Sequence, residues 1–215
     1  PPPPQAAPVL PSDDEEPAPV ELNERGVPLL TSLPEILEAL EAPAASRRKR
    51  GAKHLARLVD SSVGEQACLL GAYMREAGAV ELLVALLEDA PIVQLALMVL
   101  GNACSDAFDR AAAATRAQLR GSSVLRHLLR LISTTERTTL LYSTAALQNL
   151  CKDREHALAA LERGASSLLD RLCAQQGTAS DVSHYAAGAL LNMDAALREA
   201  RGDNQRMHAG RGDNQ

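Results

Sequence analysis

Apolar residues recur every three or four positions along most of this chain, which is the spacing of an amphipathic helix. Alternation with a period of two, the pattern of a strand, is scarce. The pattern predicts eleven helices separated by short turns. They cover residues 34–41, 46–59, 64–74, 78–87, 91–104, 109–119, 121–132, 138–151, 154–162, 164–172 and 180–193. We therefore expect an all-α protein.

From residue 64 onward the predicted helices repeat in groups of three. A glycine opens the second helix of each group, and successive glycines are 43 residues apart: Gly78, Gly121 and Gly164. An asparagine follows near the end of each third helix, at intervals of 47 and then 43 residues: Asn102, Asn149 and Asn192. Glycine suits a sharp bend between helices because it adopts positive φ without strain. A period of about 40–47 residues with three helices per group is typical of a stacked α-solenoid.

Composition agrees with a helical core. Hydrophobic residues make up 46% of the 215 residues, but aromatic residues only 2%, and Trp is absent. The core must therefore consist of Ala, Leu, Val and Ile. Residues 1–45 hold nine acidic residues and one basic residue, whereas the remainder holds 18 acidic and 21 basic residues. The body is only weakly basic, so we expect no nucleic-acid partner.

The two ends of the chain differ from the body. Residues 1–25 are rich in Pro and acidic residues, and we expect a disordered leader there. Residues 196–215 contain Arg-Gly-Asp-Asn-Gln twice and are expected to form a flexible, low-complexity tail. No secretory signal is visible, and no segment reaches the about 18 apolar residues of a membrane span. The four cysteines form no Cys-x-x-Cys pair, so we expect reduced thiols and no metal.

The recurring segments resemble armadillo repeats. The resemblance rests on Gly-Ala-Val-Glu-Leu-Leu-Val-Ala-Leu-Leu at 78–87 with Val-Leu-Gly-Asn at 99–102, and on their copies at 121–129 with 146–150 and at 164–169 with 189–193. It implies a right-handed α-solenoid of about four three-helix repeats. We place the domain at 26–195 and the repeats at about 26–62, 64–106, 107–152 and 153–195.

The resemblance also implies where a ligand would bind. In armadillo proteins the third helices line a concave groove, in which Asn residues bond the backbone of an extended peptide and Trp residues one turn earlier form pockets. The matching Asn positions here are Asn102, Asn149 and Asn192, with Arg57 in the first repeat. The positions one turn earlier hold no Trp, and are occupied by Lys53, Met98, Ala145 and Gly188. The expected groove therefore differs from that of nuclear-import carriers.

Three features have two or more interpretations. Each Asn either binds a ligand or closes its own helix end. Tyr142 and Tyr185, one turn further back, are either an anchor strip for a partner or packing residues. The basic run Arg47-Arg48-Lys49-Arg50 is a nuclear-localisation signal, a solvated face of the first repeat, or a docking place for the acidic leader.

No nucleophile–base pair, phosphate loop or metal motif is present, so we expect no enzyme activity and no cofactor. The sequence predicts a non-catalytic scaffold that binds a protein or peptide along the groove. Alternatives are an Hsp70-type nucleotide-exchange cofactor and a structural subunit of a cytoskeletal or ciliary assembly. We expect a cytoplasmic location, with nuclear entry possible through the basic run. The candidate partner-binding residues are Asn102, Asn149, Asn192, Tyr142, Tyr185, Met98, His184 and Arg57.

Overall fold

The computed structural model describes residues 20–24, 26–176 and 180–212, with side chains as far as residue 203. Within this part of the chain the regular elements are helices, and the extended segments contribute one isolated bridge between Leu22 and Pro28. The all-α expectation is confirmed. None of the described helices combines the length and the apolar character that crossing a membrane requires.

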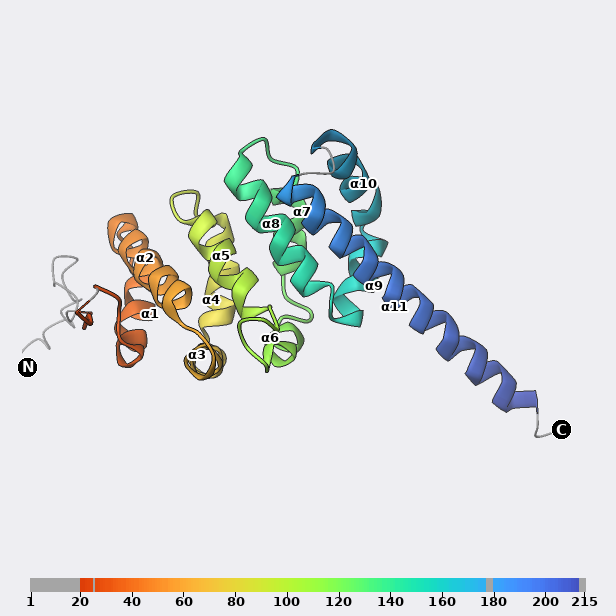
Figure 1. The fold of residues 1–215 in the computed structure, drawn as a ribbon, viewed down its shortest axis with the longest axis horizontal. Coiled ribbons are helices and arrows are strands. Elements are labelled where there is room, and N and C mark those ends of the chain that lie inside the picture. Colours follow the sequence, from red (N-terminus) through yellow and green to blue (C-terminus); the bar gives the residue numbers. More distant parts are fainter. Residues whose placement is uncertain (1–19, 25, 177–179, 213–215) are drawn as a thin grey trace, which may run out of the picture.

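The helices stack as four units, which follow one another from one end of the molecule to the other (Figure 1). Unit 1 contains the 3-10 helix η1 (Leu30–Ser32), α1 (Leu33–Glu41) and α2 (Ala45–Ser61). Unit 2 contains α3 (Glu65–Glu76), α4 (Ala79–Ala85) with the 3-10 helix η2 (Leu86–Glu88), and α5 (Val93–Ala103). Unit 3 contains α6 (Ala112–Gln118), α7 (Val124–Leu131) and α8 (Arg137–Leu150). Unit 4 contains α9 (Arg154–Glu162), α10 (Ala165–Gln176) and α11 (Asp181–Gly212).

One continuous apolar core runs through all four units. Most of its side chains are aliphatic, as the composition required, and Met74, Met193, Cys104 and Cys151 complete it. Its largest fully buried members include Ile36, Leu55, Leu70, Leu97 and Leu128, which come from units 1, 2 and 3. Each fully buried Leu or Ile contributes about 1.5–3 kcal/mol relative to an exposed one. Stacking therefore stabilises helices as short as seven residues, such as α4 and α6, which would not form alone.

The predicted glycine bends are confirmed. Gly78, Gly121 and Gly164 have φ of 72°, 74° and 76°. A Cβ at any of the three would meet no atom within 4 Å. The bend therefore requires glycine for its left-handed backbone conformation and not for space.

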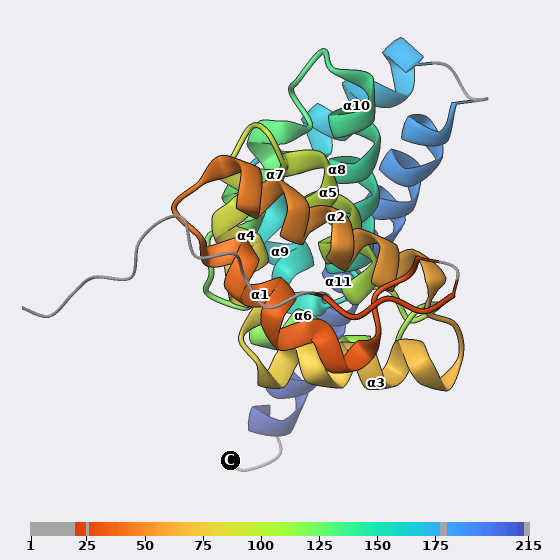
Figure 2. The ribbon, with the colours of Figure 1, turned by 90° about the vertical axis from the view of Figure 1, so that its left-hand side faces the viewer.

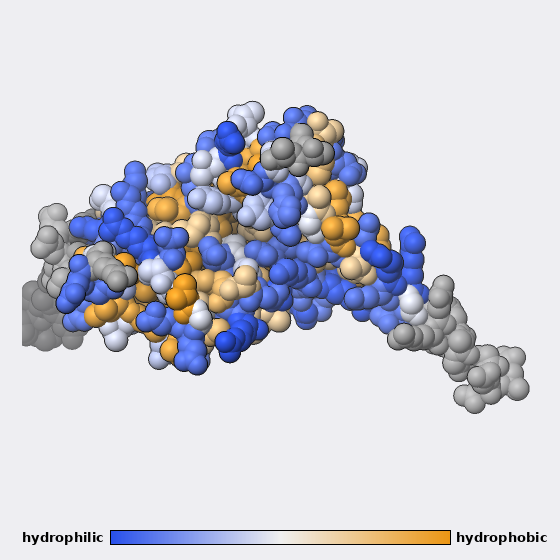
Figure 3. Space-filling view, in the orientation of Figure 1, coloured by the Kyte–Doolittle hydropathy of each residue, from blue (hydrophilic) through white to orange (hydrophobic). Residues whose placement is uncertain are grey.

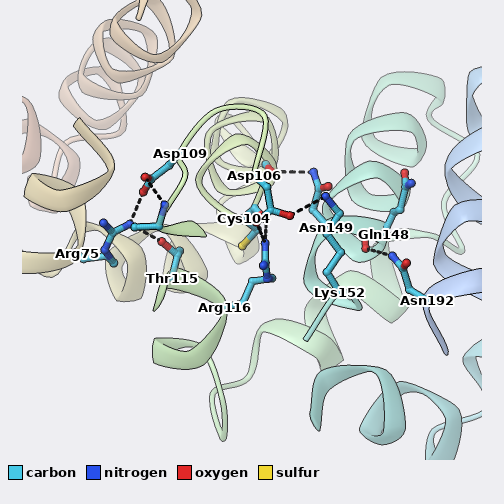
Figure 4. Close-up of polar contacts among 12 residues, drawn as sticks. Arg75, Cys104, Asp106, Asp109, Thr115, Arg116, Gln148, Asn149, Lys152 and Asn192 are labelled. Atoms are coloured by element: carbon cyan, nitrogen blue, oxygen red, sulfur yellow. Dashed lines mark hydrogen bonds and ion pairs between the residues drawn. The ribbon is translucent and has the colours of Figure 1, made fainter. Parts of the chain in front are cut away.

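Buried charges join the first helices of units 2 and 3. The Asp109 side chain is fully buried, and Arg75 of α3 donates to its Oδ2 over 2.5 Å and to Thr115 of α6 over 2.9 Å (Figure 4). Asp109 Oδ1 accepts from the Ala111 backbone N–H at 2.8 Å. Gly71 provides the room, since a Cβ there would lie 2.2 Å from Asp109 Oδ2.

The described chain begins earlier and ends later than the predicted domain. Residues 20–24 were assigned to the leader, but Val20 packs on the core and the Glu21 N–H donates to Ser32 Oγ at 2.9 Å. Residues 1–19 lie outside the described part. The prediction of a flexible tail from residue 196 is not what the structure shows, because α11 continues to Gly212 and projects beyond the stack (Figure 1). An ion pair of 2.9 Å between Arg154 and Asp203 ties this extension to α9.

Candidate protein-interaction face

The third helices α2, α5, α8 and α11 pack side by side in that order. Figure 1 shows them along one side of the stack, and Figure 2, seen from its end, shows α5 and α8 behind α2. We call their outward side the third-helix face. Figure 3 shows the molecule from this side as a mosaic of hydrophilic residues with hydrophobic residues exposed between them.

Two of the three predicted Asn residues join neighbouring third helices. Asn149 Nδ2 of α8 donates to the Gly101 carbonyl oxygen of α5 at 3.1 Å. Asn192 Nδ2 of α11 donates to the Gln148 carbonyl oxygen of α8 at 2.9 Å (Figure 4). These bonds cross from one unit to the next, whereas the two predicted roles were ligand binding and closure of the residue's own helix. Each leaves one amide N–H and the amide oxygen for other partners.

Asn102 behaves differently because it bonds within its own helix. Its Nδ2 donates to the Met98 carbonyl oxygen at 2.9 Å and lies 3.4 Å from the Met98 sulfur. Both side chains are half-buried on the third-helix face. The helix-closing interpretation thus describes Asn102, whereas Asn149 and Asn192 brace the stack.

The third helices approach closely where a small residue faces the neighbouring unit. Gly101 of α5 meets Ala146 of α8, with a hypothetical Cβ 3.6 Å from the Ala146 Cα. Gly188 of α11 meets the Gln148 side chain, whose Nε2 lies 2.3 Å from where a Cβ would stand.

Leu191 of α11 occupies the position that Gly101 has in α5 and Gln148 has in α8. Among the described residues no further helix covers Leu191, and it is 64% exposed.

A second row lies two turns before the Asn positions. Leu95, Tyr142 and Tyr185 are half-buried, one in each of units 2, 3 and 4. Leu95 and Tyr142 pack partly against the core. His184 is exposed, and its ring lies edge-on to that of Tyr185 with centroids 5.8 Å apart. The structure thus brings an aliphatic residue and two aromatic residues to matching places on the face.

Unit 1 presents a different chemistry at the same places. Arg50, Lys53 and Arg57 stand where the later units have Leu95, Met98 and Asn102, and all three are exposed. His54 lies half-buried beside them. Its pKa is lowered by burial and by the guanidinium groups of Arg57 and Arg50.

Part of the basic run Arg47–Arg50 is used inside the fold. Arg48 Nε donates to Asp89 at 2.6 Å, and its Nη1 donates to the carbonyl oxygens of Ala42 and Pro43. Arg47 lies 3.6 Å from Glu38. The run forms the first turns of α2, so two of its four cations anchor that helix.

A polar network at the end of the third helices was not predicted. Arg116 of α6 donates to the Cys104 carbonyl oxygen at 2.7 Å and to Asp106 at 2.9 Å, and Lys152 contacts the other Asp106 oxygen at 2.9 Å (Figure 4). Burial alone would raise the Asp106 pKa, but the hydrogen bonds from Lys152 and Arg116 lower it. No spacing in the sequence predicts this network, because Asp106 lies in the loop after α5, Arg116 in α6 and Lys152 in the turn after α8.

The described residues offer little reactive chemistry. Burial raises the pKa of the Cys104 and Cys151 thiols to about 12, so neither is a ready nucleophile. All four cysteines are free thiols, as expected. Among the residues that the structure describes, no three His, Cys, Asp or Glu side chains gather to hold a metal ion.

Comparison with known proteins gives matches at the level of structure. No family model matches the sequence, and no curated protein matches it. An engineered protein of known crystal structure aligns with 77% of this chain at a TM-score of 0.64 and 21% identity. A designed armadillo repeat protein aligns with 75% at 0.61 and 22% identity. Another, in complex with the peptide (KR)4, aligns with 76% at 0.60 and 21% identity.

The chain has an armadillo-like repeat fold. The resemblance seen in the sequence is therefore confirmed for the fold, and with it the α-solenoid of stacked three-helix repeats, of which unit 1 contributes two α-helices. The chain spans 64% of the length of each of these three structures.

Proposed function

We propose that this armadillo-like chain is a non-catalytic scaffold that binds a segment of a partner protein along its third-helix face. The fold supports this proposal, because one structural neighbour is a designed armadillo repeat protein in complex with a peptide. A solenoid presents the same side-chain positions at regular intervals along one surface. An extended peptide can therefore contact one set of positions in each unit.

The observation that carries the proposal is the row formed by Leu95, Tyr142 and Tyr185. These side chains sit at matching places in three successive units and remain partly exposed. Tyr combines a large apolar contact area with a hydroxyl group, and it is enriched among the residues that dominate binding energy. Two turns further along the same helices, Asn149 and Asn192 keep an amide oxygen and one N–H that can pair with a peptide backbone.

The three tyrosines of the chain supply the test. Peptides that bind the full chain would first be selected by display, and their affinities then measured by calorimetry. Tyr142→Ala and Tyr185→Ala should each weaken binding by about 2 kcal/mol, roughly 30-fold. Tyr73→Ala is the matched control, because Tyr73 lies on α3 away from the third helices and is 47% exposed. Equal effects of all three substitutions would contradict the proposed face.

The Asn residues need a separate measurement because two of them also brace the stack. Asn149→Ala and Asn192→Ala each remove one hydrogen bond between helices, which costs about 1 kcal/mol of stability. Asn102→Ala removes only a bond within α5. If the Asn row contacts the peptide, all three substitutions should weaken binding while helicity by circular dichroism stays unchanged. Loss confined to the two bracing residues would indicate an indirect effect.

A second candidate function, a structural role within a larger assembly, is favoured by exposed apolar residues on α3 of unit 2 and on α11 of unit 4. On α3, Leu69 and Tyr73 are 50% and 47% exposed and point away from Gly71, which faces α6. Tyr73 also lines a mainly apolar cavity of about 470 Å³ with residues of η1 and α1. Leu191 of α11 is also exposed. Light scattering of Tyr73→Lys and Leu191→Lys variants tests this candidate, since association through these apolar residues would be lost in both.

A further inference from the structure

The third-helix face changes its chemistry abruptly between units 1 and 2. Arg50, Lys53 and Arg57 occupy three consecutive rows in unit 1. The same rows in units 2 to 4 hold only uncharged side chains: Leu95, Met98, Asn102, Tyr142, Ala145, Asn149, Tyr185, Gly188 and Asn192. We call the three cations the α2 stripe. Along these three rows, a ligand therefore meets positive charge only in unit 1.

The α2 stripe is not neutralised by the fold. Among the described residues, Arg50, Lys53 and Arg57 take part in no ion pair, whereas Arg47 and Arg48 at the start of the same helix pair with Glu38 and Asp89. Asp60 is the one acidic residue within α2. The fold therefore uses the cations that lie at the edge of α2 and leaves those on the third-helix face for another partner.

The stripe members are close enough to act together. Residues three, four and seven apart lie on one side of a helix, with neighbouring Cβ atoms about 5–6 Å apart. The positive charge of the stripe acts on half-buried His54, because burial and then the guanidinium groups of Arg57 and Arg50 lower its pKa. A peptide that crosses α2 on its way along the face can therefore place acidic side chains near more than one stripe member.

We propose that the α2 stripe binds an acidic segment of the partner peptide, and that the uncharged rows of units 2 to 4 receive its uncharged, apolar continuation. This inference rests on the proposed function, because it specifies the ligand of the same face. Like charges across an interface are unfavourable, so a basic peptide is rejected. The designed neighbour that is in complex with (KR)4 would then have the opposite charge preference.

The test compares two peptides of equal length and opposite charge on the full chain. Fluorescein-labelled (DE)4 and (KR)4 would be titrated in fluorescence anisotropy at low and at physiological salt. We expect (DE)4 to bind and (KR)4 not to bind. The affinity for (DE)4 should fall as salt rises, because exposed charges are screened. An NMR titration should show the His54 pKa rising when (DE)4 binds, since a carboxylate beside the ring favours its charged form.

A charge-reversal variant identifies the surface. R50E/K53E/R57E should reduce the affinity for (DE)4 by about tenfold or more, because exposed ion pairs contribute modestly each and here three are reversed. The control R110E/R126E/R171E changes the net charge by the same amount at exposed residues outside α2. Glu has a helix propensity close to that of Arg and Lys, so folding should be retained in both. Equal losses in the two variants would overturn the proposal.

Two further outcomes separate the possible occupants. An oligothymidylate that displaces (DE)4 and binds more tightly would assign the stripe to nucleic acid and overturn the peptide proposal. The leader is tested by neutralising Asp13, Asp14, Glu15 and Glu16. If (DE)4 binds only that variant, the chain's own acidic segment is the occupant, and the partner proposal fails.

Failure of the charge preference can be told apart from failure of peptide binding itself. If display-selected peptides bind in a Tyr185-dependent way but carry no acidic residues, the charge preference is wrong and the proposed function stands. If no peptide of any charge binds the third-helix face, both fail.

Discussion

Gly71→Ala is the substitution for which the structure makes its sharpest energetic prediction. In an ordinary helix interior this change stabilises by about 0.5–1 kcal/mol, because Ala restricts the unfolded chain. At position 71 the new Cβ would lie 2.2 Å from Asp109 Oδ2 and 2.8 Å from its Cγ. Asp109 cannot swing aside, since Arg75 and the Ala111 N–H both hold its carboxylate and the residue is 0% exposed.

The size of the effect follows from two costs. Overpacking of a close-packed interior costs about 1–3 kcal/mol. Separation of the buried carboxylate from Arg75 costs up to about 3–5 kcal/mol. With both costs added and the gain of about 0.5–1 kcal/mol from Ala subtracted, we expect Gly71→Ala to destabilise the fold by about 3–7.5 kcal/mol.

Urea unfolding followed by circular dichroism at 222 nm measures this difference. Gly101→Ala is the matched control, because its Cβ would lie 3.6 Å from Ala146, an ordinary van der Waals distance. That variant should be unchanged or slightly more stable. In an Asp109→Ala background, Gly71→Ala should lose most of its cost, since the two changes share one site. If Gly71→Ala is as stable as Gly101→Ala, the clash with Asp109 does not exist and the reasoning is refuted.

Two further predictions concern reactivity and pH. Alkylation with iodoacetamide near pH 8, followed by mass spectrometry, should modify half-buried Cys68 well before Cys104 and Cys151. Burial shields these two thiols and raises their pKa to about 12, which keeps them protonated. Early labelling of either buried thiol in the folded chain would contradict this prediction. Glu136 caps α8 through hydrogen bonds from Thr138 and Thr139, which lower its pKa from 4.5 to about 2. The stabilisation by this cap is present above pH 4.5 and is lost as the pH falls towards 2. Over that interval, the urea midpoint of Glu136→Gln should therefore fall less than that of the unmodified protein. Parallel pH profiles of the two proteins would argue against the cap.

The sequence predicted what depends on local periodicity. The helix at 154–162 was placed at its observed bounds, and the bends at Gly78, Gly121 and Gly164 were found from spacing alone. Both features are set by residues within one or two turns of each other. The repeat of these features then predicted the order of stacking, because similar units bury their apolar faces on one another.

Features that depend on contacts between units were not predictable in this way. Asn149 and Asn192 occupy the predicted rows, but only the spacing of the helices decides that their amides reach the preceding unit. The polar, glycine-containing sequence after residue 196 suggested a flexible tail. The structure instead extends α11, and the ion pair from Arg154 to Asp203 spans 49 positions of the sequence.

The two-helix form of unit 1 has a consequence for how the molecule opens. In a stack where each unit contacts only its neighbours, cooperative unfolding starts at the unit with the smallest interface. Unit 1 has one neighbour, and α2 contacts α5 less extensively than α5 contacts α8 or α8 contacts α11. Amide protons of α1 and α2 should accordingly exchange by sub-global opening ahead of those in α5 and α8. The α2 stripe would then sit on the most labile segment of the solenoid, so a ligand that bound it would slow exchange throughout unit 1.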